Sequence, residues 1–231
     1  MKRRRALLTF VTTAALAASG IALAPSNARA QDLERGAELF ALCSQCHGDQ
    51  GQGSRLALAP SIAGLEKWYV VKQLQNFKDG LRARHFDDLA GMRMRPMALW
   101  LKTPEDIDAV ASYVASLPSV PIVVTLEGGD AARGAALYAT CSGCHGLKGE
   151  GVEPVGAPSL IHTSDWYQRT QLLNYKQGIR GTDPRDVQGA AMRGMSMLLA
   201  DEQAIKDVLA HIATLSQAPA TQPPLPAGGA E

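Results

Sequence analysis

The sequence predicts an all-α protein built from two similar helical domains. The chain has 231 residues and repeats itself after 98 positions, in a register that holds without a gap from Arg35 to Leu117. Within each copy, apolar residues recur at the three- and four-residue steps that place them on one face of a helix. No stretch sustains the alternation of a half-buried strand, apart from the short segment 121–124 in the middle of the chain.

The repeat defines the domain organisation. Residues 35–48 (RGAELFALCSQCHG) align with residues 133–146 (RGAALYATCSGCHG), and the agreement continues through the rest of the unit. Segment 119–130 between the copies contains proline and a glycine pair and has no helical periodicity, which is typical of an extended linker. We therefore predict domains at 31–118 and 131–216, followed by a Pro-rich flexible tail at 217–231.

Three helices are expected in each copy. In the first copy, one helix covers about 32–43 and carries cysteines at its C-terminal end, and a second covers 66–80 and stops at Gly80. The third starts at Thr103, an N-cap that is followed by proline in the first turn, and extends to Leu117. The Met-rich segment that precedes the third helix is expected to be a loop in both copies.

The first thirty residues have the pattern of a secretory signal peptide. Four basic residues at positions 2–5 precede an apolar run from Ala6 to about Ala24, and an Ala-x-Ala pattern ends just before Gln31. An uncleaved membrane anchor is the alternative, because the run is at the lower limit of the length that spans a bilayer. The cleavage pattern favours removal of residues 1–30 and a mature protein in the periplasm.

The charge balance argues against nucleic acid as a partner. The whole chain has a formal charge of +1, and loss of residues 1–30 removes five basic residues and no acidic ones, which leaves −4. Nucleic-acid-binding domains present a basic stripe or patch, and none is expected here. A mildly acidic chain suits a soluble carrier with a locally patterned docking face.

Each copy contains one CxxCH motif, the attachment signature of c-type haem. The four cysteines occur only in these motifs, as Cys43, Cys46 and His47 and as Cys141, Cys144 and His145. Two thiols three positions apart can each add to one vinyl group of a haem, and the next imidazole is then held beneath the iron. A zinc ribbon needs its two CxxC pairs close in sequence, and a CxxC disulfide is strained and leaves the histidines unexplained. We expect two covalently attached haem c groups, each with its motif histidine as an iron ligand.

With these motifs, the proline downstream of each, the Trp-Tyr helix and the Met-rich segment, residues 32–216 resemble the tandem di-haem class I cytochromes c, specifically the cytochrome c4 type. The resemblance implies a His/Met-ligated iron in each domain, with the second ligand from the Met-rich segment. The family-like spacing favours Met94 and Met192 for that role. Met97 and Met195 also keep the repeat and remain the alternative.

Two further repeated pairs are expected beside the haems. Pro60 and Pro158 resemble the family proline whose carbonyl accepts a hydrogen bond from the proximal histidine and so orients it. Arg82 and Arg180 are candidates to neutralise haem propionates, because a guanidinium offers a planar fork to carboxylates. The lysine one turn before each arginine is expected to assist.

Together these features predict an electron carrier and not an enzyme. A thioether ligand stabilises ferrous iron and raises the potential, which suits a component late in a respiratory chain. Its redox protein partners are expected to be a donor such as a quinol-oxidising complex or a dehydrogenase, and an acceptor such as a terminal oxidase, with any membrane association made through those complexes. One alternative is a cytochrome subunit of an exported dehydrogenase. A di-haem peroxidase is the least favoured, because its two haem sites should differ whereas these motifs are nearly equivalent.

Overall fold

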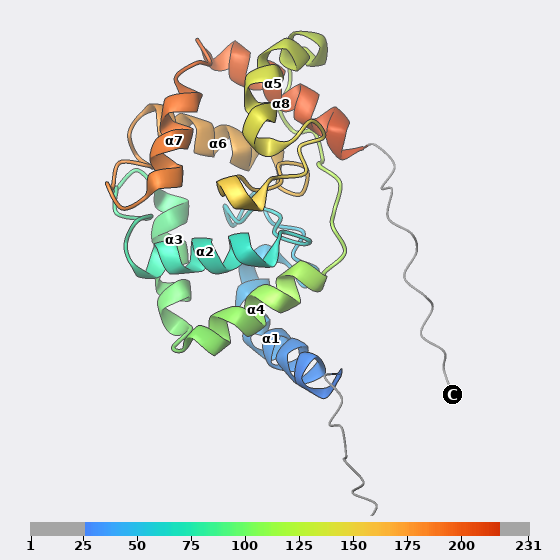
Figure 1. The fold of residues 1–231 in the computed structure, drawn as a ribbon, viewed down its shortest axis with the longest axis vertical. Helices are drawn as coiled ribbons and strands as arrows, with labels where there is room; N and C mark the ends of the chain where they lie inside the picture. The colour runs from blue at the N-terminus through green and yellow to red at the C-terminus, as the bar shows by residue number, and fades with distance from the viewer. Residues whose placement is uncertain (1–25, 218–231) are drawn as a thin grey trace, which may run out of the picture.

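The chain folds into two helical domains that lie side by side (Figure 1). The structure is a computed structural model that describes residues 26–217, and this range contains no strand. The all-α prediction is therefore confirmed. Most of the predicted signal peptide and nearly all of the predicted tail lie outside the described residues. Between residues 26 and 217, no helix combines the length and the apolar character needed to cross a membrane.

Four α-helices form each domain. The N-terminal domain contains α1 (Ser26–His47), α2 (Lys67–Lys78), α3 (Leu89–Trp100) and α4 (Pro104–Ser116). The C-terminal domain contains α5 (Ala131–His145), the short 3-10 helix η1 (Glu153–Val155), α6 (Asp165–Lys176), α7 (Val187–Ser196) and α8 (Glu202–Ser216). The six expected helices correspond to α1, α2 and α4 in the N-terminal domain and to α5, α6 and α8 in the C-terminal domain.

The Met-rich segments are helices, so the prediction of loops there was wrong. Each of these helices begins after an aspartate N-cap, where Asp88 accepts a hydrogen bond from the Gly91 amide at 3.0 Å and Asp186 accepts one from Gly189 at 2.9 Å. A side-chain N-cap contributes about 1 kcal/mol and determines where a helix starts. Pro96 lies inside α3 and removes one backbone donor, yet the helix continues to Trp100.

The first and last helices of each domain cross closely at a glycine. A Cβ atom on Gly36 of α1 would lie 2.3 Å from the carbonyl oxygen of Ala109 in α4. A Cβ atom on Gly134 of α5 would lie 1.9 Å from the carbonyl oxygen of Asp207 in α8. Only a hydrogen atom at these positions lets the two backbones approach so closely. The crossing fixes the direction in which α1 and α5 carry their CxxCH ends.

The two domains meet through α2, α6 and the neighbouring loops (Figure 1). The linker between them is extended, and its second half is attached to the C-terminal domain. Asp165 accepts hydrogen bonds from the Thr125 amide at 2.6 Å, the Thr125 hydroxyl at 2.7 Å and the Leu126 amide at 3.0 Å. These bonds hold the second half of the linker against the start of α6, and the Ile122 amide donates to the Ser216 hydroxyl of α8 at 2.9 Å. Only residues 119–121 are therefore left to span the gap between the domains.

Candidate functional site

The CxxCH motifs form the C-terminal ends of α1 and α5. The helix expected at 32–43 continues to His47, so Cys43, Cys46 and His47 all lie in the last turns of α1, and α5 ends in the same way at His145. All four cysteines are free, and in each motif the first is half-buried and the second exposed. Gly48, which follows His47 at the end of α1, has a φ of 79°. Glycine adopts this left-handed conformation readily, and it ends the helix.

Both motif histidines are buried and held by a hydrogen bond to a carbonyl. Nδ1 of His47 lies 2.8 Å from the carbonyl oxygen of Pro60, and Nδ1 of His145 lies 2.8 Å from that of Pro158. A carbonyl only accepts, so Nδ1 donates the proton and Nε2 keeps a free lone pair. Burial lowers the pKa of both imidazoles, although the carbonyl bond opposes this. Nε2 of His145 is buried and has no partner among the described residues.

A single cavity extends from one motif histidine to the other. Its volume is about 1740 Å³ including its open mouth. Its lining includes the two histidines and one methionine from each Met-rich helix, which are His47, His145, Met94 and Met192. Met97 lies outside this lining and is 38% exposed, and Met195 also lies outside it.

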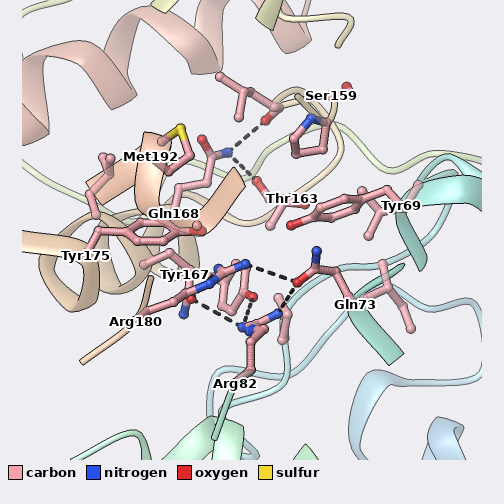
Figure 2. A pocket seen from close by; sticks show the side chains of 18 of the residues that line it. Tyr69, Gln73, Arg82, Ser159, Thr163, Tyr167, Gln168, Tyr175, Arg180 and Met192 are labelled. Atoms are coloured by element: carbon pink, nitrogen blue, oxygen red, sulfur yellow. Dashed lines mark hydrogen bonds between the residues drawn. The ribbon is translucent and has the colours of Figure 1, made fainter. Parts of the chain in front are cut away.

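Two buried arginines meet where the cavity crosses the domain interface (Figure 2). Arg82 donates to Oε1 of Gln73 at 2.8 Å and to Oε1 of Gln171 at 3.3 Å. Arg180 donates to Oε1 of Gln171 at 2.7 Å and to Oε1 of Gln73 at 3.1 Å. Arg82 also donates to the Tyr167 hydroxyl at 3.2 Å. The glutamines are equivalent positions of the repeat, as are the arginines, so the domains contact each other reciprocally, as subunits do in a symmetric dimer.

Neither arginine is paired with a carboxylate within residues 26–217. The Arg82 guanidinium lies 4.3 Å from the ring centroid of Phe77, and that of Arg180 lies 4.7 Å from that of Tyr175. Nε of both arginines is buried without a partner. Burial raises the pKa of Tyr167, but the two guanidiniums outweigh it and hold that pKa below its ordinary value. The two guanidiniums therefore make this part of the cavity positive, and it suits an anionic group.

The lysines one turn before the arginines bind elsewhere, so their predicted role beside the arginines was wrong. Lys78 donates to the carbonyl oxygen of Leu101, and Lys176 donates to that of Leu199. These carbonyls follow the ends of α3 and α7, where the helical hydrogen-bond ladder leaves acceptors unpaired. The lysines thereby attach the Met-rich helices to α2 and α6.

The residues present fit a haem c group in each domain. A haem has a largely apolar ring, a central iron and two carboxylates. The cavity offers apolar side chains for the ring, an unprotonated Nε2 and a thioether for the iron, and two unpaired guanidiniums for the carboxylates. Free cysteines stand beside it at the ends of α1 and α5, where they are placed for covalent attachment.

The chain is similar to known proteins in both sequence and structure. Cytochrome c4 of Thiocapsa roseopersicina is 32% identical over 186 residues, which cover 76% of this chain and 88% of that protein. The thiosulfate dehydrogenase electron acceptor of Stutzerimonas stutzeri strain A1501 is 32% identical over 182 residues, which cover 74% of this chain and 78% of that protein. Reduced recombinant cytochrome c4 from Pseudomonas stutzeri has a TM-score of 0.63 at 27% identity, covering 78% of this chain and 97% of that one. The structure of thiosulfate dehydrogenase from Marichromatium purpuratum has a TM-score of 0.64 at 30% identity. The match covers 80% of this chain and 41% of that one.

The cytochrome c family profile matches residues 33–118 and residues 131–216. The chain therefore belongs to the cytochrome c family, with two such domains in tandem. It is a di-haem cytochrome of the c4 type, an electron-transfer protein with two covalently bound haem c groups.

The repeat predicted the arginines of the site but not the groups that hold them. Gln73, Gln171 and Tyr167 all belong to the interface network. The repeat contained a usable signal, because glutamine occupies position 73 and its equivalent 171, and tyrosine occupies 69 and 167. Polar residues retained at matching positions of α2 and α6 indicate a shared role.

Proposed function

We propose that each iron is held between the motif histidine and the cavity methionine, His47 with Met94 in the N-terminal domain and His145 with Met192 in the C-terminal domain. The observation that carries this assignment is the single cavity that all four side chains line. Exposure of Met97 on the outer face of α3 argues against the alternative methionine.

The prolines and arginines take supporting roles in this proposal. The carbonyls of Pro60 and Pro158 accept the Nδ1 proton of the ligating histidine, which fixes the ring and makes its Nε2 a better donor to iron. Arg82 and Arg180 supply the positive charge that the propionates need in a buried place. Both arginines lie at the domain interface, so they would hold the propionates of the two haems there.

Bound haem c supplies one-electron chemistry through its ferrous and ferric states. The motif histidine and the cavity methionine of each domain would ligate its iron, and the apolar side chains of the cavity would keep water from it. A filled sixth position leaves no place for oxygen or peroxide, which favours electron transfer over a peroxidase.

The test of this ligation is the visible spectrum of the reduced protein before and after carbon monoxide is added, with haem content measured on the same sample. Two haems and an unchanged spectrum are expected, because each iron already has two side-chain ligands and no position is left for carbon monoxide. A shift at either haem would mean an open iron and would overturn the ligation at that domain in favour of catalysis.

We further propose that the chain is exported to the periplasm with residues 1–30 as its signal peptide. The mature protein then consists of domains 31–118 and 131–216, the linker 119–130 and the tail 217–231. The basic start, the apolar run and the Ala-x-Ala pattern support export. Mass spectrometry of the purified periplasmic protein should give an N-terminus at Gln31, and a chain that begins at Met1 in the membrane fraction would refute cleavage.

Redox partners are proposed to dock on the apolar surface beside the cavity. In the N-terminal domain this surface includes Leu56, which is 99% exposed, and Leu89, which is 61% exposed. The two domains differ in charge there, because Arg55 in the first domain corresponds to Glu153 in the second. Different donor and acceptor proteins therefore suit the two domains, with a quinol-oxidising complex or dehydrogenase as donor and a terminal oxidase as acceptor. Charge reversal by Arg55→Glu should slow electron exchange with one partner and leave the other unchanged.

A second candidate function is that of the electron-accepting subunit of an exported dehydrogenase. A relative named as a thiosulfate dehydrogenase electron acceptor, and the match to part of a thiosulfate dehydrogenase chain, favour it. Rapid reduction of both haems by a purified thiosulfate dehydrogenase and thiosulfate would support this function. Reduction no faster than with an unrelated cytochrome would exclude it.

A further inference from the structure

One peptide group beside the C-terminal haem site is bonded to both domains. The carbonyl of Pro158 accepts the hydrogen bond from Nδ1 of His145 at 2.8 Å. The amide of the same peptide group, on Ser159, donates to Oε1 of Glu66 at 2.9 Å. Glu66 belongs to the N-terminal domain, where it is the N-cap residue of α2. A carboxylate of one domain is thus joined through one peptide group to the buried imidazole of the other.

The equivalent position in the N-terminal haem site carries no charge. Ser164, the repeat equivalent of Glu66, is the N-cap residue of α6. Its hydroxyl oxygen accepts a hydrogen bond from the Ser61 amide at 3.2 Å, and the carbonyl of that peptide group, on Pro60, bonds His47. The two cross-domain connections have the same pattern of hydrogen bonds, but one ends in a carboxylate and the other in a hydroxyl.

The carboxylate of Glu66 is poorly solvated. Its Oε2 atom is buried and has no hydrogen-bond partner among the described residues. A Cβ atom on Gly151 would lie 2.8 Å from Oε1, so the carboxylate packs directly against the loop of the other domain. Burial raises the pKa of Glu66, the amides of Glu66 and Ser159 oppose this, and Glu153 adds to it. Weak solvation makes the field of a charge act over a longer range.

We infer that Glu66 is a positioning and tuning residue for the haem of the C-terminal domain, and that it lowers the reduction potential of that haem relative to its partner. An amide that donates to a carboxylate is polarised, and its carbonyl becomes a better acceptor for the Nδ1 proton of His145. The imidazole then donates more charge to the iron and favours the ferric state. The negative charge itself acts in the same direction. Glu66 shifts a shared electron towards the N-terminal haem.

The inference rests on the proposed ligation by His145, and a charge-neutral variant tests it. Glu66→Gln keeps an oxygen that accepts from the Ser159 amide and removes only the charge. The matched control is Ser164→Ala, at the equivalent position of the other domain. Both are made in a Cys144→Ala background, where one unreacted vinyl group moves the absorption band of the C-terminal haem and lets each haem be titrated separately. Glu66→Gln and Ser164→Ala are also made without Cys144→Ala, so the comparison still holds if Cys144→Ala causes loss of haem.

Spectroelectrochemical titration should give a higher potential for the C-terminal haem in Glu66→Gln. The expected change in the distribution of one electron between the haems is about tenfold, equivalent to about 59 mV for a one-electron couple. Ser164→Ala should leave the potential of the C-terminal haem unchanged. An unchanged C-terminal potential, or an equal rise at both haems, would overturn the tuning role. Binding of carbon monoxide by the C-terminal haem of the parent protein would instead show that the ligation itself fails.

Discussion

Replacing Gly134 by alanine should destabilise the C-terminal domain, because α5 and α8 cross at this residue. The added Cβ would lie 1.9 Å from the carbonyl oxygen of Asp207, 2.6 Å from its carbonyl carbon and 3.0 Å from Cβ of His211. The first two are backbone atoms, so the helices themselves must move apart. Overpacking of this kind costs about 1–3 kcal/mol, and removal of a helical glycine returns roughly 0.5–1 kcal/mol. The two shortest distances are to backbone atoms, so the cost lies in the upper half of its range and the net loss is about 1–2 kcal/mol. This loss lowers Tm by roughly 5–15 °C in a domain of about 90 residues.

Gly143→Ala is the matched control for this prediction. Gly143 lies in the same helix and is exposed, and a Cβ atom added there would point into open space, with no neighbouring side chain or element within 4 Å. Its replacement should raise stability by roughly 0.5–1 kcal/mol. Thermal unfolding of both variants is followed by far-ultraviolet circular dichroism at equal haem content. A Gly134→Ala protein that unfolds at or above the parental temperature would refute the claim that the close crossing constrains α5.

Three further predictions address the site, the acid stability and the linker. Met94→Ala should remove the Met-to-iron band of one ferric haem and lower its potential, while Met97→Ala leaves visible spectrum and potential unchanged; the reverse result would reassign the ligand. The hydrogen bond from Arg133 holds the pKa of Asp207 below its ordinary value of about 3.9. The ionised Asp207 therefore contributes its full stabilisation above about pH 3.9, and this stabilisation is lost as the pH falls below that value. Asp207→Asn should therefore lower stability to urea at pH 7 and reduce the loss between pH 5 and pH 2, and an unchanged acid profile would contradict this. Asp165→Ala should release the second half of the linker and speed its cleavage by a nonspecific protease, and equal cleavage rates would show that these bonds do not hold it.

The helices that were predictable are those whose apolar residues all face one core. Ile107, Val110 and Val114 of α4 recur at three- and four-residue steps, which predicts one helix face, and all three are buried. The Met-rich helices escaped prediction because they contact the domain along a narrow strip. Leu89 is 61% exposed and Trp100 is 44% exposed, so apolar residues in α3 do not mark a buried face. Its start depends on an N-cap, which periodicity does not detect.

Local parts of the site were readable from the sequence, and parts that need two domains were not. Each motif histidine and its proline are 13 residues apart within one copy, so the motif and the repeat together locate both. The bond between Arg180 and Gln73 joins residues 107 apart, and that between Glu66 and Ser159 joins residues 93 apart. Such contacts depend on how the domains dock, which no pattern within one copy specifies.

The reciprocal interface has a consequence for how this protein could diversify. In a dimer of identical chains, every interface residue occurs twice, and a change that adjusts one haem adjusts the other equally. Joining the two copies through a linker removes that restriction, while the tether keeps the two faces at high effective concentration. Each domain then contributes to its neighbour's environment independently, as glutamate does at position 66 and serine does at position 164. Two copies within one chain thus allow an otherwise symmetric contact to make two chemically identical cofactors unequal.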